Sequence, residues 1–359
     1  MKRMIRNISL LLLALLFVVS CKRKPLSDDC LCVSTIAIPI SVDWSTSGVD
    51  VQNVTLLVYN ADDGSLFYEH WFEHSTDAIQ SYVSLPVGSY TAVVFNELRK
   101  SGQIDYVTCV DHENISTLKF ESFDATPLRS RADTRAYVQE PGDLALSIVE
   151  DIVITDDMIL EAAEIAALAN GTKSLSTSTR TAVESLTGIV PLKKNTTITI
   201  TAYVKNIYYA LMPALVDITN LADGYYVYGD QNSTTPSTLQ VAMYKAYAVD
   251  FFDGTISATM STFGTLGDRS STSEHDSDTP IEVDALFKLV DNTTEESLYM
   301  DVTQYVTHSE QADGSYHITI DFAFDGELSV VQPSDSGGDS GFGSSLEDWE
   351  EGESVDLNN

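Results

Sequence analysis

The sequence predicts an all-β protein of two antiparallel β-sandwich domains with one helical insertion, following a lipoprotein signal peptide. Runs of alternating apolar and polar residues recur along the chain, which is the pattern of half-buried strands. Five Asp-Gly pairs punctuate these runs, and Gly adopts the positive φ of a tight hairpin turn at little cost. A length of 359 residues suits two domains, each large enough to bury a core.

The first twenty-one residues predict export. Three basic residues precede an apolar run over 8–19, which is too short to span the ~30 Å hydrocarbon core of a bilayer as a helix. The run ends at Val18-Val19-Ser20-Cys21, which resembles a bacterial lipobox. We therefore expect that residues 1–20 are removed and that Cys21 is acylated, with palmitate among its chains, at the head of a tether over 21–32. An ordinary signal with a chance cysteine is the alternative.

The charge balance excludes one class of partner. Loss of residues 1–20 removes three basic and no acidic residues, so the net charge falls from −33 to −36. A chain this acidic repels the phosphate backbone of nucleic acids and favours solubility. Lys22, Arg23 and Lys24 follow Cys21 directly, and they would lie beside lipid headgroups.

Residues 33–190 form the first predicted domain. Five strands of a meander are expected over 33–96, with Asp63-Gly64 as one hairpin turn, and two more strands near 106–110 and 144–154. The first strand has the clearest alternation, with Ile36, Ile38, Ile40, Val42 and Trp44 on one face. One helix is predicted near 156–170, with Thr155 as its cap, and the Ser/Thr-rich stretch 172–187 is predicted to be a loop.

Residues 191–333 form the second predicted domain. Ile198, Ile200, Ala202 and Val204 share one face of a strand, and Ile318, Ile320, Phe322 and Phe324 share one face of another. Residues 334–359 are predicted to be a flexible acidic linker and a terminal strand. In that strand Trp349 would bury the largest area, while Val355 and Leu357 would share a face. Such a strand either completes its own sheet or is donated to another subunit.

The sequence predicts no catalytic residues, metal site or cofactor. His70 and His74 are four residues apart, but their surroundings predict a strand, in which they lie about 13 Å apart. Cys109 can pair with Cys30 or with Cys32 in an oxidising compartment, and the residues leave both pairings open. The tyrosines at 208, 209, 225, 226 and 228 fit either a sugar-binding surface or strand packing, and we favour packing.

One loop carries an unusual group of arginines, at positions 129, 131 and 135. The simplest interpretation is a solvated loop. The alternative is a processing site for a trypsin-like protease. An anchor that must keep its lipid-bearing N-terminus would remain uncut, so we expect an intact chain.

Several stretches together resemble a known family. They are Cys21-Lys-Arg-Lys-Pro, Ile40-Ser-Val-Asp-Trp44, Val54-Thr-Leu-Leu-Val-Tyr-Asn60, Leu85-Pro-Val-Gly-Ser-Tyr90 and Val94-Phe-Asn96. Their succession is similar to that of the fimbrillin-like lipoproteins of Gram-negative gut and oral anaerobes, especially the group allied to the minor, anchoring subunits of type V fimbriae. The tail over 346–357 resembles fimbrillin C-termini, where a last strand follows a Trp.

The resemblance implies transthyretin-like sandwich domains and a lipoprotein of the outer membrane or cell surface. It implies a fimbrium subunit, an anchor or accessory one, that assembles with other fimbrial subunits by strand donation and supports adhesion. A glycan-binding surface lipoprotein is the second hypothesis. An enzyme is the third, and abundant carboxylates are its only support.

Overall fold

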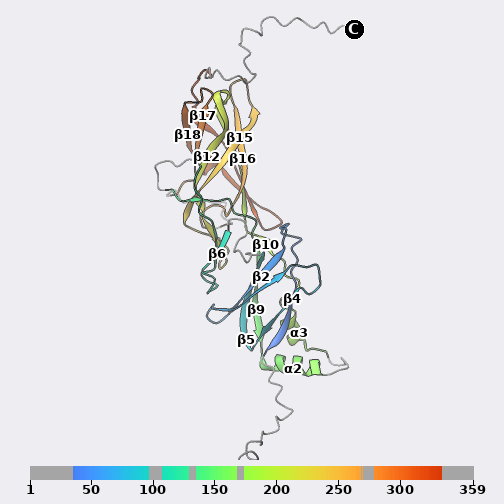
Figure 1. Ribbon diagram of the computed structural model, residues 1–359. Coiled ribbons are helices and arrows are strands. Elements are labelled where there is room, and N and C mark those ends of the chain that lie inside the picture. The colour runs from blue at the N-terminus through green and yellow to red at the C-terminus, as the bar shows by residue number, and fades with distance from the viewer. Residues whose placement is uncertain are drawn as a thin grey trace, which may run out of the picture.

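The computed structural model describes residues 35–96, 107–128, 135–167, 174–267, 269 and 279–333. Its strands are arranged along an elongated molecule (Figure 1). Sheets with two helices form one end, and a large sheet forms the other. An all-β fold is therefore confirmed for the described residues, together with mainly antiparallel pairing.

The end that carries the helices contains two sheets. One has five strands in the order β10-β9-β5-β2-β3, and β1 pairs with β4 in the other. Their bounds are β1 (Ile36–Ile40), β2 (Asn53–Asn60), β3 (Leu66–Glu73), β4 (Ser81–Leu85), β5 (Gly88–Asn96), β9 (Ala145–Ile154) and β10 (Leu192–Lys193). The five strands expected over 33–96 are confirmed, but the simple meander is wrong. β4 turns back to β1, and β5 pairs with β2, because β1 must cover the apolar face of the larger sheet.

The alternation of the first strand serves this packing. Ile36, Ile38 and Ile40 are at most 3% exposed, and they pack against a core that includes Val54 and Leu56 of β2. Pairing β1 with β4 places a second row of apolar side chains over the same core. The two sheets therefore form layers around one hydrophobic cluster.

Two helices lie beside these layers. α2 (Asp156–Ala167) begins where predicted, and the Thr155 hydroxyl accepts a hydrogen bond from the N–H of Met158 at 3.4 Å. The loop predicted over 172–187 is wrong in part, because α3 (Thr177–Val183) lies within it. Its Ser and Thr residues have low helix propensity. Tertiary packing stabilises this helix despite its low propensity, since Thr179 and Ala182 are buried and the Ser176 side chain caps the first turn.

The other end is a sheet of nine strands in the order β18-β17-β12-β15-β16-β11-β20-β19, with β8 added beside β15. Their bounds are β8 (Tyr137–Val138), β11 (Thr196–Lys205), β12 (Ala210–Ala222), β15 (Pro236–Ala248), β16 (Gly254–Thr262), β17 (Glu282–Leu289), β18 (Glu295–Asp301), β19 (Val306–Glu310) and β20 (Tyr316–Glu327). Two short 3-10 turns accompany them, η1 (Ile207–Tyr209) and η2 (Thr303–Tyr305). The expectation of purely antiparallel pairing is wrong at two places, because β11 runs parallel to β20 and β8 runs parallel to β15.

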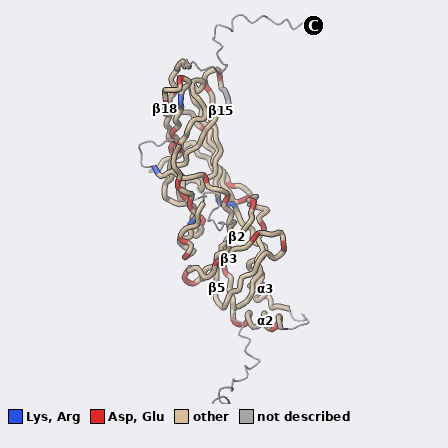
Figure 2. The backbone as a smooth tube through the Cα atoms, in the orientation of Figure 1, with Lys and Arg blue, Asp and Glu red and all other residues tan. Residues whose placement is uncertain are grey.

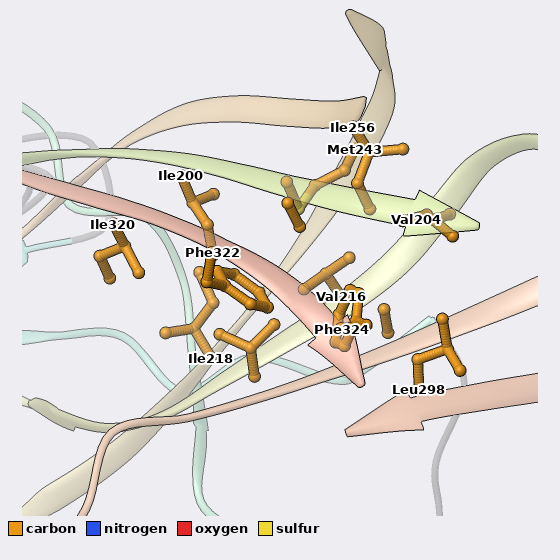
Figure 3. Close-up of a cluster of buried hydrophobic side chains, with 14 of the residues drawn as sticks. Ile200, Val204, Val216, Ile218, Met243, Ile256, Leu298, Ile320, Phe322 and Phe324 are labelled. Carbon is orange, nitrogen blue, oxygen red and sulfur yellow. The ribbon is translucent and has the colours of Figure 1, made fainter. Parts of the chain in front are cut away.

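The nine-stranded sheet encloses a second cluster of buried side chains. Ile200, Val216 and Phe322 come from β11, β12 and β20 and point toward one another (Figure 3). The alternation predicted for β11 and β20 is confirmed, since Ile198, Ile200, Ile318 and Ile320 are all at most 1% exposed. The sheet can bury one face on itself because β18 approaches β20.

A third core joins the two ends. It combines Phe95 of β5 and Phe120 of β7 with Tyr225 of β13 and with Phe263, and all four are at most 1% exposed. The rings of Phe95 and Phe120 meet edge to face, with centroids 5.0 Å apart. A four-stranded sheet in the order β14-β13-β7-β6 covers this core. Its bounds are β6 (Val107–Val110), β7 (Lys119–Ser122), β13 (Gly224–Tyr226) and β14 (Gln231–Asn232).

The Asp-Gly pairs fulfil the hairpin prediction in part. Asp63-Gly64 joins β2 to β3, and Gly64 has the positive φ of +71° that the turn needs. Asp253-Gly254 and Asp313-Gly314 lie at the β15–β16 and β19–β20 turns. Asp325-Gly326 instead lies within β20, and Asp223-Gly224 leads into β13, which pairs with β7 across the third core.

We expect Phe120→Ala to lower the free energy of unfolding by about 3–5 kcal/mol, because it leaves a cavity in the core that joins the ends. Phe251→Ala is the matched control, since that ring is 75% exposed, and its effect should stay within about 0.5 kcal/mol. Urea unfolding followed by circular dichroism measures both. Equal midpoints for the two variants would contradict a structural role for the third core.

Candidate functional site

The described chain begins and ends at opposite ends of the molecule. Ile36 pairs with Leu85, close to Gly88, which pairs with Ile154 just before α2. We call this the helix end. β20 runs parallel to β11, and both strands lead away from the helix end. The N–H of Leu328, just after β20, donates to the Lys205 carbonyl at 3.3 Å. The turns near 205–210, 249–253 and 290–293 surround this second end, which we call the far end.

The far end carries a group of aromatic side chains, Tyr208, Tyr209, Phe251 and Phe252, here named the far-end aromatic group. Tyr208 is 52% exposed and Phe251 is 75% exposed. Their rings stack at 5.5 Å, and the rings of Tyr209 and Phe252 lie nearly parallel at 6.0 Å. A cluster of large apolar side chains on the surface is typical of a contact surface.

Hydrogen bonds fix the loops that hold these rings. The Tyr208 N–H donates to the Phe252 carbonyl at 3.0 Å. The Asp253 carboxylate accepts from the Tyr203 hydroxyl at 2.6 Å and from the Asn206 N–H at 2.8 Å. The bond from Tyr203 contributes most to holding the pKa of Asp253 below its usual value. The far-end aromatic group is therefore presented on ordered turns.

The tyrosines that the sequence singled out do not form one surface. Tyr225 is fully buried in the third core, where its hydroxyl donates to Asp230 at 2.6 Å. Tyr208 belongs to the far-end aromatic group, and the exposed Tyr228 follows β13 at the junction of the two ends. The structure therefore does not support a sugar-binding surface at 225–228. The sequence does not identify Phe251 and Phe252 as surface residues, because a pair of Phe residues before Asp-Gly also fits the buried end of a strand.

The third arginine of the predicted processing loop is engaged in the fold. Asp217 of β12 and Asp284 of β17 stand directly opposite each other, and both are at most 5% exposed. Two carboxylates so placed repel each other. Arg135 contacts both, at 3.4 Å and 3.8 Å, and the Tyr137 hydroxyl donates to Asp217 at 2.9 Å. Arg135 thus compensates a buried pair of negative charges, and Arg129 and Arg131 lie outside the described residues.

A second charged cluster lies at the junction of the two ends. Arg269 and Lys194 reach Asp230 at 3.1 Å and 2.9 Å, and Arg269 also lies over the ring of Tyr225 at 5.1 Å. Burial alone would raise the pKa of Asp230, but the bond from Tyr225 and the charges of Lys194 and Arg269 lower it to about 2. These contacts explain the charged cluster as one that stabilises the fold at the junction of the two ends.

The remaining predicted positions are placed as follows. Cys109 is a free cysteine among the described residues, and burial first, then the charge of Glu69, raises the pKa of its thiol to about 12. Cys21, Cys30, Cys32, Trp349, Val355 and Leu357 lie outside the described residues. His70 lies in β3, and no grouping of metal-ligating side chains occurs within the described ranges. None of the helices described there is long and apolar enough to cross a membrane.

The chain matches one family model and several solved structures. The family described as "Domain of unknown function (DUF5119)" matches residues 20–242. No curated protein matches the sequence. A candidate adhesin from Bacteroides ovatus is 15% identical, with a TM-score of 0.56 over 84% of this chain and 94% of that one.

Two further structures come from Porphyromonas gingivalis. The fimbrial anchor protein Mfa2 is 10% identical, with a TM-score of 0.41 over 80% of this chain and 91% of that one. The tip fimbrial protein Mfa3 is 9% identical, with a TM-score of 0.35 over 74% and 81%. The likeness to the B. ovatus structure shows a shared fold, and the fimbrillin-like resemblance is confirmed at that level.

We expect Arg135→Ala to destabilise the fold by about 2–4 kcal/mol, because it removes a cation that contacts both Asp217 and Asp284, two buried carboxylates that stand opposite each other. The control is Arg180→Ala, which removes an exposed pair with Glu184 and should cost no more than about 0.5 kcal/mol. Urea unfolding midpoints compare the two. An unchanged midpoint for Arg135→Ala would show that the arginine does not compensate the two carboxylates.

Proposed function

The chain belongs to the DUF5119 family, and we propose that it is a fimbrium subunit of the cell surface, an anchor or accessory one. In this proposal acylated Cys21 holds it in the outer membrane. The fold shared with a candidate adhesin from B. ovatus supports an adhesin-like role. Other fimbrial subunits are its partners.

One observation carries the proposal most directly. Residue 35 lies at the helix end, and Leu328 lies at the far end of an elongated molecule (Figure 1). A lipid on Cys21 would therefore act at one end, while the segment 334–359 leaves from the other. A subunit that links a membrane to the next subunit requires this polarity.

Strand donation by the C-terminal segment is the proposed mode of assembly. The segment 334–359 has 26 residues and, fully extended, reaches at most roughly 90 Å. Trp349, Val355 and Leu357 would fill pockets in the next subunit, while main-chain hydrogen bonds give affinity. The far-end aromatic group lies at the same end of the molecule as Leu328, whose carbonyl accepts from Asn206, so we expect the captured subunit to be held against exposed apolar rings. These rings supply the kind of surface that subunit contact buries.

Residues 33–190 and 191–333 are the two proposed domains. The third core contains Phe95 and Phe120 from the first range and Tyr225 and Phe263 from the second. The domains would therefore resist bending about their junction. A stiff subunit transmits tensile force along a fibre without unfolding at the junction between its domains.

Deleting residues 346–359 tests strand donation. The shortened chain should keep its cooperative unfolding, because a donated strand packs in the next subunit and the described members of the three cores all precede residue 346. It should no longer co-purify with sheared surface fimbriae from the native organism. The matched control keeps the tail and replaces residues 335–345 with a Gly/Ser linker of equal length. Loss of folding in the deletion, or unaltered co-purification, would identify the strand as part of its own sheet.

Replacing Cys21 with Ala tests the lipid anchor. The variant should appear in the soluble fraction and carry no labelled fatty acid, because acyl chains contribute about 0.8 kcal/mol per buried CH₂. Cell fractionation with labelled palmitate gives the readout, and Cys109→Ala is the control. A variant that still pellets with membranes and carries label would place the anchor elsewhere.

A further inference from the structure

The far end gathers lysines that have no ion pair. Most basic side chains in the described ranges contact a carboxylate: Lys119, Arg135, Arg180, Lys193, Lys194 and Arg269. The remaining ones form no ion pair with a described residue, and they are Lys205, Lys245 and Lys288. Lys205 ends β11, Lys288 is the next to last residue of β17, and Lys245 lies three residues before the end of β15. All three therefore lie beside the turns of the far end.

The acidic residues of the far end do not pair with these lysines. Each aspartate of the turns accepts main-chain N–H groups of the turns themselves, namely Asp250, Asp253 and Asp291. Glu327 and Glu295 stand opposite Lys205 and Lys288 in the strand pairing, but they form no ion pair with them. The lysines can therefore receive carboxylates from another segment.

The aromatic rings beside these lysines are exposed. Tyr208 lies at the centre of the far-end aromatic group, because its ring contacts those of Tyr209, Phe251 and Phe252 at 5.3, 5.5 and 6.0 Å between centroids. Tyr208, Phe251 and Phe252 are all more than a third exposed. Exposed apolar groups of this size mark a contact surface or a liability to aggregate. A fitting occupant offers an apolar side chain to the rings and carboxylates to the lysines.

The segment 334–359 carries that combination of side chains. It has eight acidic residues and no basic one. Trp349 stands in the middle of the densest acidic run, directly flanked by Glu347, Asp348, Glu350 and Glu351. An aromatic ring among carboxylates matches exposed rings among unpaired lysines, and the opposite charges attract at low salt.

The segment also starts at the far end. The Leu328 carbonyl accepts a hydrogen bond from the Asn206 side chain at 2.9 Å, two residues before Tyr208. Trp349 comes sixteen residues after Pro333, and an extended chain of that length reaches at most roughly 55 Å. A short tether gives an effective concentration on the order of a millimolar, so a weak contact is enough to hold the segment.

We propose that, in a subunit that has not assembled, the segment 334–359 folds back onto its own far end. Trp349 packs against the far-end aromatic group, and its acidic neighbours lie beside Lys205, Lys245 and Lys288. The inference deepens the proposed function, because it gives the surface that meets the next subunit a protected state before assembly. Donation of the segment then withdraws Trp349 and exposes the rings to the captured subunit.

The test uses the full mature chain with Cys21→Ala, labelled with 5-fluorotryptophan and observed by fluorine NMR. Trp349→Phe identifies the signal of position 349. We expect that signal to differ from the signal of a free peptide of residues 346–359, because the ring is packed rather than solvated. The signal should not change when the protein is diluted, because the contact lies within one chain.

Tyr208→Ala removes the ring that contacts the other three, and it should lower the ratio of docked to free segment roughly ten-fold. Tyr82→Ala is the matched control, because Tyr82 is 57% exposed and lies on β4 at the helix end. It should leave the ratio unchanged. Circular dichroism verifies that both variants are folded.

A second variant tests the charges. Lys205→Gln combined with Lys288→Gln should lower the docked ratio roughly three-fold at low salt, and the difference should shrink at high salt. The control is Arg180→Gln, because Arg180 is an exposed cation of α3 at the helix end. It should leave the ratio unchanged at either salt concentration.

A signal of position 349 that matches the free peptide, or that Tyr208→Ala leaves unaltered, would overturn the proposal. A signal that changes on dilution would assign the far end to the segment of a second copy, and it would overturn the proposal as well. Docking in a chain that does not co-purify with fimbriae would overturn the fimbrial function alone. Co-purification without docking would overturn this inference alone.

Discussion

The third core holds the two ends of the molecule as one body. Phe95 lies on β5 at the helix end, and Phe120 lies on β7 of the adjoining sheet. Tyr225 lies on β13, which comes after β12 of the nine-stranded sheet in the chain, and Phe263 comes directly after β16. Because all four side chains are almost completely buried, separating the two ends from each other would expose large aromatic rings to water. The order of β14-β13-β7-β6 adds main-chain pairing across the same junction. The polarity of the molecule depends on this contact, since a flexible junction would not fix the far end opposite the helix end.

Charge is a second constraint on this fold. Acidic residues are spread along its length, with few cations among them (Figure 2). Three buried or half-buried cations stand where the fold brings carboxylates together. Lys119 contacts Glu121 and Asp223 at 2.7 Å and 3.0 Å, Arg269 contacts Asp230, and Arg135 lies between Asp217 and Asp284. A chain with 53 acidic and 20 basic residues therefore places several of its few cations beside carboxylates that the fold brings together.

The two ends of the molecule differ in the surfaces that they present. The helix end lies where the described chain begins, and the far end carries exposed aromatic rings on ordered turns. In the proposed subunit the first end serves the membrane and the second serves the neighbouring subunit. Their separation lets both contacts exist at the same time.

The local pattern of the sequence determined the strands themselves. The alternation of Ile198, Ile200, Ala202 and Val204 predicts a strand with a single buried face, which is β11. Asp63-Gly64 likewise encodes the turn between β2 and β3 within a few residues. The start of α2 was also determined by nearby sequence, because the side chain of Thr155 caps the helix.

Only the tertiary structure decided which strands meet. The parallel pairing of β11 with β20 joins residues more than a hundred positions apart, and the burial of Tyr225 depends on strands from both ends. α3 forms against its own weak propensity because Ala182 packs on the core, and Arg135 acquired its role from two carboxylates on distant strands. Periodicity reports which face of an element is buried, whereas the partner that buries it is set by the balance of packing, hydrogen bonding and charge over the whole chain.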